Sequence, residues 1–239
     1  MKKTDFRNII TDQDQMSEAF IVNAILAFSG GFQDAYTYIT RDGVFANAQT
    51  GNIVLMSTSF LQGKWLTGVR YLGPILAFIL GVLIADTVDK KWHKTSFIHW
   101  RQIVIVLEII ILFAVGFMPP AWNIAANIFV SFSCAMQVQA FRTVGGGIVY
   151  ASTMCVGNLR SGTAALSEYI HTKEKENLHR ALYYFGIILV FALGAGIGAI
   201  ASMHCSLHII WVCCALLLAA SLLMDFDRKG RKKQNEKKK

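Results

Sequence analysis

The chain has 239 residues, of which 54% are hydrophobic and 16% are charged, with a mean hydropathy of +0.44 and a formal net charge of +8. Soluble domains carry about 25% charged residues, so this composition excludes an ordinary soluble domain. The positive charge does not indicate nucleic-acid binding, because eight of the 23 Lys and Arg residues lie in one C-terminal segment, "DRKGRKKQNEKKK" at 227–239. That segment is expected to be a cytoplasmic tail, either an anchor that contacts anionic lipid headgroups or, as the favoured alternative, a solvated and disordered segment with no further role.

Six apolar stretches are long enough to cross a membrane as helices, since about 20 apolar residues span a hydrocarbon core of ~30 Å. They cover residues 18–39, 70–88, 99–118, 121–142, 181–202 and 206–225. Their apolar residues run continuously, and a backbone in lipid must satisfy its hydrogen bonds internally. We therefore predict an all-α integral membrane protein. The first eighteen residues carry four acidic side chains, and no cleavable signal peptide is expected.

Two shorter and more polar segments, residues 45–62 and 150–170, interrupt the series of spans. Residues 41–51 are poor helix material, and the helical pattern resumes at Asn52. The helix that follows reaches only ~15–20 Å, which is half a bilayer. We expect each segment to enter the membrane as extended chain and to return to the same side as a half-helix. Tilted helices in the membrane interface are the alternative.

The order span, short segment, span, span occurs twice. "VFANAQTGN" (Val44–Asn52) aligns with "YASTMCVGN" (Tyr150–Asn158) at an offset of 106, and "QDAY" (Gln33–Tyr36) aligns with "VQAF" (Val138–Phe141) at an offset of 105. We therefore predict a single membrane domain over residues 1–239. It comprises repeat halves at 18–118 and 121–226 and the basic cytoplasmic tail at 227–239.

The distribution of Lys and Arg bears on whether the short segments cross. If both segments return, the chain has six crossings, and the only Lys and Arg residues outside are Arg41, Lys64 and Arg70. If both segments cross, 16 Lys and Arg residues lie inside and 6 lie outside, with Arg160 set aside. The positive-inside rule favours the first arrangement, with both termini cytoplasmic. Three crossings per half turn the second half upside down, which predicts a 3+3 inverted repeat of the kind found in transporters.

Small residues recur at four-residue steps in two of the predicted spans. They are Gly73, Ala77, Gly81 and Ala85 in one span, and Gly186, Gly194 and Gly198 in the other. Such spacing favours close helix packing in a membrane, although glycine is also simply frequent in membrane helices.

The beginnings of the two half-helices are candidate binding positions. A helix N-terminus offers free N–H groups and the positive end of the helix dipole. Polar side chains there could hydrogen-bond a polar or anionic solute, or could act as ordinary helix caps. The residues concerned are Thr50, Gly51 and Asn52 in the first half, and Thr153, Gly157 and Asn158 in the second.

The same residues carry a resemblance to a known family. Gly31, Asp34 and Ala35, followed by Thr50-Gly51-Asn52, resemble the paired motifs of the YoaK-like bacterial multi-pass membrane proteins, whose function is unknown. The second copy of the motifs usually reads "QNA…TGNL", but here "VQAF" and "CVGNL" place Val156 at the threonine position and Gln139 near the asparagine position. The resemblance covers nearly the whole chain and implies a bacterial plasma membrane protein, but it implies no biochemical activity.

Glu108 is the most unusual ionisable residue, because it lies near the centre of an apolar span, "IVIVLEIIILF". An unpaired carboxylate at that depth costs several kcal/mol. Glu108 could therefore serve as a proton relay or cation site. It could equally be a structural group that is hydrogen-bonded or ion-paired to a neighbouring helix.

Three further residues could belong to the same site. Asp34 could bind solute, pair with Arg41 seven residues later, or be hydrated. Arg160 could be a counter-ion for either acid or could extend to the inner interface. Gln139, like Gln137, could line the cavity or only hydrogen-bond between helices.

Metal and cofactor sites are not expected. The five cysteines, Cys134, Cys155, Cys205, Cys213 and Cys214, lie in or beside apolar segments and are interpreted as buried small hydrophobic residues. The pair His204 and His208 lacks the acidic residue of a zinc protease motif.

Three classes of function remain open. A small transporter or channel for an unidentified solute or ion is favoured by the inverted repeat, the half-helices and Glu108. A non-catalytic scaffold or sensor is the alternative. A membrane-embedded enzyme would need a clustered acid, base or metal, so no enzymatic activity is expected. The expected partners are membrane lipids and the solute, without nucleic acid. A homodimer is a candidate assembly, because six spans are few for alternating access.

Overall fold

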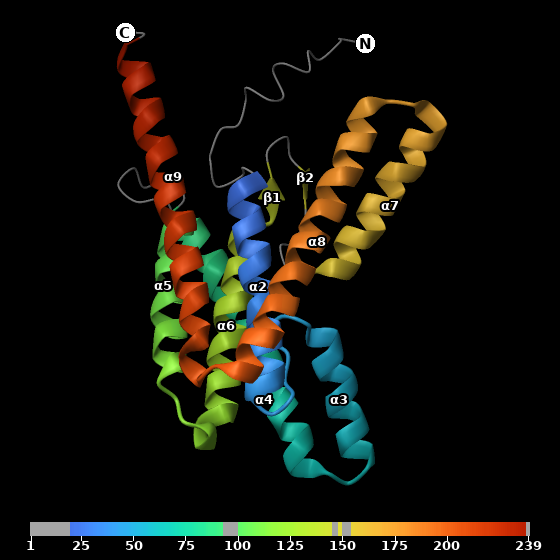
Figure 1. Ribbon diagram of the computed structural model, residues 1–239, viewed down its shortest axis with the longest axis vertical. Coiled ribbons are helices and arrows are strands. Elements are labelled where there is room, and N and C mark those ends of the chain that lie inside the picture. Colours follow the sequence, from blue (N-terminus) through green and yellow to red (C-terminus); the bar gives the residue numbers. More distant parts are fainter. Residues whose placement is uncertain (1–19, 93–99, 145–147, 150–153, 238–239) are drawn as a thin grey trace.

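The computed structural model describes residues 20–92, 100–144, 148–149 and 154–237 (Figure 1). Within them the chain is almost entirely helical. The elements in chain order are α2 (Phe20–Thr40), α3 (Gln49–Leu61), α4 (Trp65–Trp92), α5 (Trp100–Gly116), η2 (Pro120–Trp122), α6 (Asn123–Ala140), α7 (Cys155–Thr172), α8 (Lys175–His204), η3 (Leu207–Ile210) and α9 (Trp211–Lys237). Two antiparallel strands of two residues each, β1 (Thr143–Val144) and β2 (Ile148–Val149), follow α6.

Each of the eight predicted segments coincides with one of these α-helices, so the all-α prediction is confirmed for the described residues. Two helices are longer than expected. α7 has 18 residues, against the 13 of α3, and α9 continues to Lys237. The prediction of a disordered tail at 227–239 is therefore wrong up to residue 237. Lys, Arg, Gln and Glu are good helix formers and no proline interrupts the segment, so the helix of the preceding span can continue through it.

The long helices lie side by side and alternate in direction (Figure 1). α3 starts at the level of the middle of the molecule and runs toward the end at which α2 finishes, whereas α7 runs toward the opposite end. α3 packs on α4, and α7 packs on α8. Each short helix thus forms a hairpin with the long helix that follows it.

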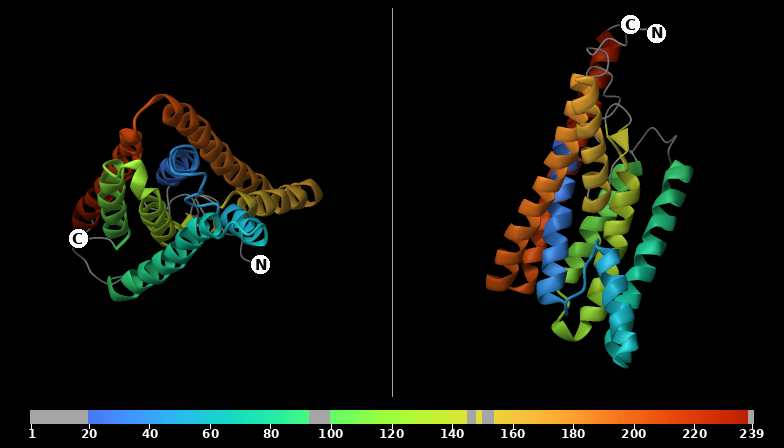
Figure 2. Two further views of the ribbon diagram at one scale, coloured as in Figure 1. Left: turned by 90° about the horizontal axis from the view of Figure 1, so that it is seen from below. Right: turned by 90° about the vertical axis from the view of Figure 1, so that its right-hand side faces the viewer.

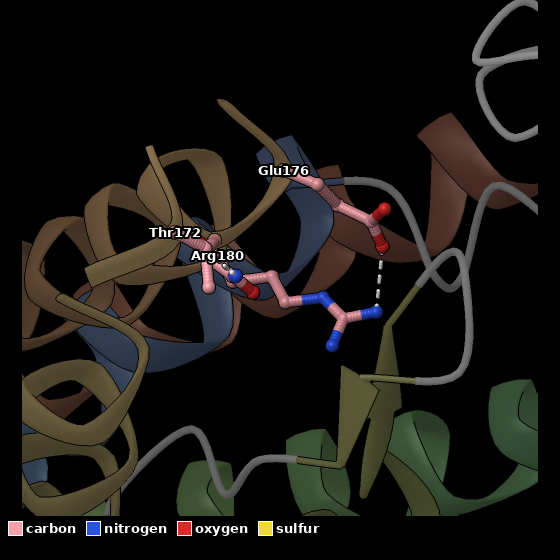
Figure 3. Close-up of polar contacts among 4 residues, drawn as sticks. Thr172, Glu176 and Arg180 are labelled. Atoms are coloured by element: carbon pink, nitrogen blue, oxygen red, sulfur yellow. Dashed lines mark hydrogen bonds and ion pairs between the residues drawn. The ribbon is translucent and has the colours of Figure 1, made fainter. Parts of the chain in front are cut away.

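The turns of these hairpins have specific local causes. Gly63, with φ of +73°, reverses the chain between α3 and α4, and Lys173, with φ of +58°, ends α7. At the second turn Arg180 forms an ion pair of 2.7 Å with Glu176, one helical turn earlier on α8 (Figure 3). The Thr172 hydroxyl accepts a hydrogen bond of 3.3 Å from the backbone N–H of Glu174. Polar residues therefore stabilise the turn between α7 and α8.

Four stretches of the described residues are long and apolar enough to cross a membrane: Trp65–Lys91, Pro120–Ala140, Lys175–His204 and Leu207–Asp225. α2 and α5 do not reach that measure. α5 has 17 residues, and α2 carries a series of buried polar side chains. Six crossings therefore stay a prediction, whereas the four apolar helices agree with a membrane protein.

α2 is enclosed by the other long helices (Figure 2). Six consecutive residues, from Ser29 to Asp34, are buried, and six residues cover more than one full turn of helix. All faces of α2 are therefore covered at this level, where α8, α9 and α6 pack around it. A helix in this position must find every hydrogen-bond partner for its polar side chains inside the protein.

Glycine allows α2 and α8 to touch backbone to backbone. A Cβ atom built on Gly194 of α8 would overlap the carbonyl oxygen of Phe28, and one built on Gly31 of α2 would overlap the carbonyl oxygen of Phe191. The contact is reciprocal, since each helix presents a glycine to a carbonyl of the other.

α4 and α6 approach each other in the same way. A Cβ on Gly81 would lie 2.5 Å from the Phe132 carbonyl oxygen and 2.8 Å from the Cβ of Ala135. The side chain of Ile128 covers Gly73 at 3.0 Å. The prediction that the small residues serve close packing is confirmed at these positions.

At the end of α2 the side chain of Arg41 is fully buried. Its guanidinium donates to the carbonyl oxygens of Val115 (3.0 Å) and Met118 (2.9 Å) and to Oδ1 of Asn123 (3.0 Å). Two more of its N–H groups donate to the Tyr36 hydroxyl at 2.8 and 3.2 Å. Because the Val115 carbonyl lies in the last turn of α5 and Met118 follows the helix by two residues, the cation also complements the negative end of that helix dipole.

The Arg41 contacts join four parts of the chain. The Tyr36 hydroxyl donates to the carbonyl oxygen of Leu207 in η3 at 3.0 Å, and Nδ2 of Asn127 in α6 donates to the Arg41 carbonyl at 2.7 Å. The ends of α2 and α5, the start of α6 and η3 are therefore tied together at one end of the bundle by a single buried cation.

The first prediction concerns Gly194. Replacing it by leucine places a side chain against the Phe28 backbone, which cannot yield easily, so Gly194→Leu should reduce the free energy of unfolding by about 1–3 kcal/mol. Gly196→Leu, on the same helix, is the matched control, because a Cβ atom at Gly196 would meet no atom within 4 Å. Thermal unfolding of the purified protein in detergent measures both. An equal loss of stability in the two variants would contradict the close contact.

The second prediction concerns Arg41. Arg41→Gln should reduce the free energy of unfolding by about 3 kcal/mol, because buried acceptors on α5 and α6 lose their donors. Arg41→Lys should recover only part of that loss, since an ammonium group cannot donate in three divergent directions. Arg70→Gln, at an exposed arginine of α4, should change stability little. Full recovery by lysine in thermal unfolding experiments would show that only the charge matters.

Candidate functional site

The candidate site is a set of buried polar side chains between α2 and α6, closed on one side by α5. Its centre is Glu108, a residue in the middle of α5 whose side chain is 0% exposed. Nε2 of Gln33 on α2 donates to Oε1 of Glu108 at 3.1 Å. The side-chain nitrogen of Gln137 on α6, assigned to the side that faces the carboxylate, donates to its two oxygens at 3.0 and 3.1 Å.

The orientation of Gln33 is fixed by its other contacts. The Cys134 thiol donates to Oε1 of Gln33 at 2.9 Å, and Nε2 of Gln33 also donates to the Ser29 hydroxyl at 3.1 Å. The amide nitrogen can therefore face only Glu108 and Ser29. The Cys213 thiol of α9 completes the group by donating to the Ser29 carbonyl at 3.8 Å.

Glu108 has no cationic partner among the described residues. The ion pairs found there join Lys90 to Asp86 at 2.6 Å and Arg180 to Glu176, both on exposed helix surfaces. Of the two roles left open for Arg160, that of a counter-ion is not observed, because Arg160 is exposed on α7 and interacts with neither Asp34 nor Glu108 within the described residues. Two neutral amides thus provide all the hydrogen bonds that Glu108 receives from this part of the chain.

A second acidic residue, Asp34, holds the chain that follows α2. Its Oδ1 accepts a hydrogen bond of 2.6 Å from the backbone N–H of Asn47. Nδ2 of Asn47 donates to the Gly30 carbonyl at 3.3 Å, and the Ser131 hydroxyl of α6 donates to the Ala46 carbonyl at 3.0 Å. Residues 44–47 are therefore drawn back along α2 and packed between α2 and α6, which agrees with the extended return predicted before the first half-helix.

The predicted pair of Asp34 and Arg41 is not formed. Both side chains are buried, but Asp34 binds the Asn47 backbone and Arg41 binds α5 and α6. The spacing of seven residues places them on one face of α2 as expected. The loop returns along that face, however, and its backbone amide occupies the carboxylate.

Asn52 fixes the same loop from α3. Its Nδ2 donates to the Phe45 carbonyl at 2.8 Å and its Oδ1 accepts from the Phe45 N–H at 3.0 Å. A Cβ on Gly51 would lie 3.0 Å from the Phe45 ring, so glycine leaves room for it, and that ring stacks on Tyr38 at 4.7 Å. The capping role predicted for Thr50 and Asn52 is wrong: the N-cap is Ala48 without a side-chain cap, and Thr50 is exposed.

The second half matches this arrangement only in part. Asn158 is buried near the start of α7, like Asn52 in α3. Gly157 is exposed and borders open space within the described residues. Gln139 is half-buried near the end of α6, and Thr153 lies outside the described residues. Within that part of the chain, the first half alone shows a loop held by an acid.

Several residues of the site were not predicted from the sequence. Gln33, Ser29 and Cys134 surround Glu108, and Asn47 and Ser131 hold the loop. The available signal was that Gln33 and Gln137 are amides within predicted spans, where lipid offers no partner. No group of three or more His, Cys, Asp or Glu that could hold a metal ion occurs within the residues described.

Comparison with known proteins agrees with the family expected from the motifs. Residues 22–223 match the model of a family described as protein of unknown function, DUF1275. The chain is also 27% identical over 223 residues to the UPF0700 transmembrane protein YoaK of Bacillus subtilis (strain 168), an alignment that covers 87% of this chain and 95% of that protein. No solved structure matches. The chain therefore belongs to the DUF1275 family and is a membrane protein of a family whose function is unknown.

Proposed function

We propose that this protein is a transporter or channel for a small solute, with its binding site between α2 and α6. One observation carries the proposal. Buried polar side chains continue along α2 and the residue after it from Asn23 to Arg41, with Asp34 among them, and along α6 from Asn123 to Gln137. Glu108 of α5 receives hydrogen bonds from both helices. Such groups are costly in a membrane protein and mark solute or ion pathways when they face the interior. A scaffold would be more stable with an apolar interface at this place.

We further propose that the six long helices cross the membrane as a 3+3 inverted repeat. In this arrangement α2, α3, α4 and α5 correspond to α6, α7, α8 and α9. The contacts between helices support it, because three contacts of the first half have counterparts in the second: α2 with α8 and α6 with α4, α3 with α4 and α7 with α8, α5 with α6 and α9 with α2. α5 and α9 are counterparts of each other and also contact each other, as expected for two helices beside a twofold axis.

Residue spacing supports the same correspondence. Asn23 and Asn127, Ser29 and Ser133, and Gln33 and Gln137 are buried polar pairs, each 104 residues apart. The carbonyls that meet Gly194 and Gly81 belong to Phe28 and Phe132, which are also 104 apart. This register differs by one residue from the offset of 105 inferred from "QDAY" and "VQAF". Contacts define the register better than those short and weakly similar stretches.

The chemistry of the site favours a neutral or cationic solute over an anion. Two carboxyl groups lie at its centre, and the side-chain oxygens of Asn47 and Asn127 are buried without a hydrogen-bond donor among the described residues. A solute with N–H or O–H groups would supply the missing donors. A simple anion would bring further acceptors instead of the missing donors. The anionic solute suggested by the helix dipoles is therefore not part of the proposal.

The proposal places the protein in the bacterial plasma membrane, with both termini in the cytoplasm and with α3 and α7 as half-helices that do not cross. Its partners are the solute, the surrounding lipids and, as a candidate assembly, a second copy of the chain. It assigns no enzymatic activity to the protein.

The third prediction tests the topology. Single cysteines are introduced by Gln62→Cys, Arg142→Cys and Glu174→Cys, all exposed positions, in a background where the accessible native cysteines are serine. A membrane-impermeant maleimide should label Gln62→Cys in intact cells. It should label the other two only after permeabilisation. Ser206→Cys, expected outside in either topology, controls for access.

Two outcomes of the labelling would contradict the proposed topology. Protection of Gln62→Cys in intact cells would mean that α3 crosses the membrane. External labelling of Arg142→Cys or Glu174→Cys would place the end of α6 or of α7 outside. Either result removes the inverted repeat.

The fourth prediction tests transport. Proteoliposomes containing the wild-type protein should move at least one member of a panel of cationic, neutral and anionic solutes. Glu108→Gln should slow that flux at least tenfold. Asp34→Ala, which releases the loop at Asn47, should slow it as well. Glu168→Gln, at an exposed glutamate of α7, should leave it unchanged.

Absence of flux for every solute would favour a scaffold or sensor. Flux that survives Glu108→Gln would place the pathway elsewhere in the molecule. Thermal unfolding of each variant in detergent shows whether a change in flux reflects loss of the fold.

A further inference from the structure

Glu108 occupies a unique place relative to the two proposed halves. The two glutamines that donate to it, Gln33 and Gln137, are counterparts 104 residues apart, one from each half. Opposite Glu108, α9 contributes Cys213 and Cys214, and the Cys214 thiol donates to the Ile109 carbonyl at 3.7 Å. One carboxyl group is therefore shared by equivalent residues of both halves.

The atoms around Glu108 are arranged for a carboxyl group and not for a metal cation. A hard cation requires several oxygen ligands directed at it. Here both glutamines turn N–H donors toward the carboxyl group, and the free oxygen of Gln33 is taken by the Cys134 thiol. With Gln137 assigned in this way, both amides present nitrogen and not oxygen to Glu108.

The remaining titratable neighbours supply no positive charge. Those that face Glu108 are Cys134 on α6 and Cys213 and Cys214 on α9. Asp34 on α2 interacts with Cys134 as well. From α4 and η3, which also pack on α5, no titratable side chain interacts with Glu108 within the described residues. A negative charge on Glu108 would thus stay uncompensated in a fully buried site.

We propose that Glu108 is a proton-binding group, and that the proton is the ion to which solute movement is coupled. Binding transfers a proton from hydronium to a carboxylate oxygen of Glu108, with formation of the O–H bond and release of water; the reverse step returns the proton to water. Gln33 and Gln137 are positioning residues that hold the carboxyl group between the halves. The coupling rests on the proposed transport function, whereas proton binding does not.

The fifth prediction is tested by infrared spectroscopy of the purified full-length protein in lipid nanodiscs. A carboxylic acid C=O band should persist at neutral pH, where exposed carboxyl groups are ionised, and should disappear on titration to high pH. The band should be absent in Glu108→Gln. It should remain in Glu168→Gln, the exposed control, and in Asp34→Asn.

Variants that keep Glu108 provide a second test, which holds even if Glu108→Gln does not fold. Gln33→Leu and Gln137→Leu each remove an N–H donor that favours the ionised carboxylate. Each should therefore move the titration midpoint of the band to higher pH, by roughly one pH unit. A merely structural role of the glutamines would lower thermal stability without moving the midpoint.

The outcomes separate the two proposals. If the wild type shows no such band, or if the band does not depend on Glu108, proton binding at Glu108 is refuted whatever the protein transports. If neither glutamine variant moves the midpoint, the positioning role of Gln33 and Gln137 is refuted. If the band titrates as expected but proteoliposomes show no Glu108-dependent proton or solute flux, the proton site stands and the transport function falls. If solute flux occurs without pH dependence and without proton movement, the coupling is refuted.

Discussion

The buried polar side chains of α2 must find their partners inside the protein, because other helices cover this helix on all faces between Ser29 and Asp34 and lipid offers no hydrogen bonds. The constraint explains most of the interior. Gln33 is satisfied by Glu108 and Cys134, Asp34 by the Asn47 backbone, and Arg41 by the C-terminal end of α5. These partners come from different elements. The polar residues of α2 therefore specify how the loop, α5 and α6 are placed around it.

The motif residues acquire a physical meaning from the same constraint. Asp34 and Asn52 are 18 residues apart in the sequence, yet both hydrogen-bond to the backbone of residues 45–47. Gly51 leaves space for the Phe45 ring, and Gly31 lets α2 and α8 touch. The motifs thus hold an extended segment between α2 and α6, where its backbone would otherwise lack partners. They position the site, whereas Glu108 lies outside both motifs and supplies the carboxyl group at its centre.

Close backbone contact and buried polarity are linked in this bundle. Reciprocal glycines bring α2 against α8, and Gly81 brings α4 against α6. Between α2 and α6, in contrast, contact is made by hydrogen-bonding side chains such as Gln33 and Cys134. Tight apolar packing on the outer sides of α2 and α6 therefore leaves a polar layer between them. That distribution is what a pathway between two moving halves would require, since the apolar contacts can stay intact while the polar layer changes its partners.

The sequence by itself determined the number and type of the helices, because continuous apolar runs of about twenty residues and shorter polar interruptions are read directly from composition and length. It also identified Glu108 and Asp34, since a carboxylate within an apolar span is unusual wherever the helix lies. Only the tertiary structure decided what these residues contact. Asp34 and Arg41 are seven residues apart, but Asp34 binds the returning loop and Arg41 binds α5 and α6, and Asn52 binds Phe45 instead of capping its helix. Gln33 and Gln137 meet at Glu108 because three helices converge there, and convergence of distant segments depends on packing that no local pattern records.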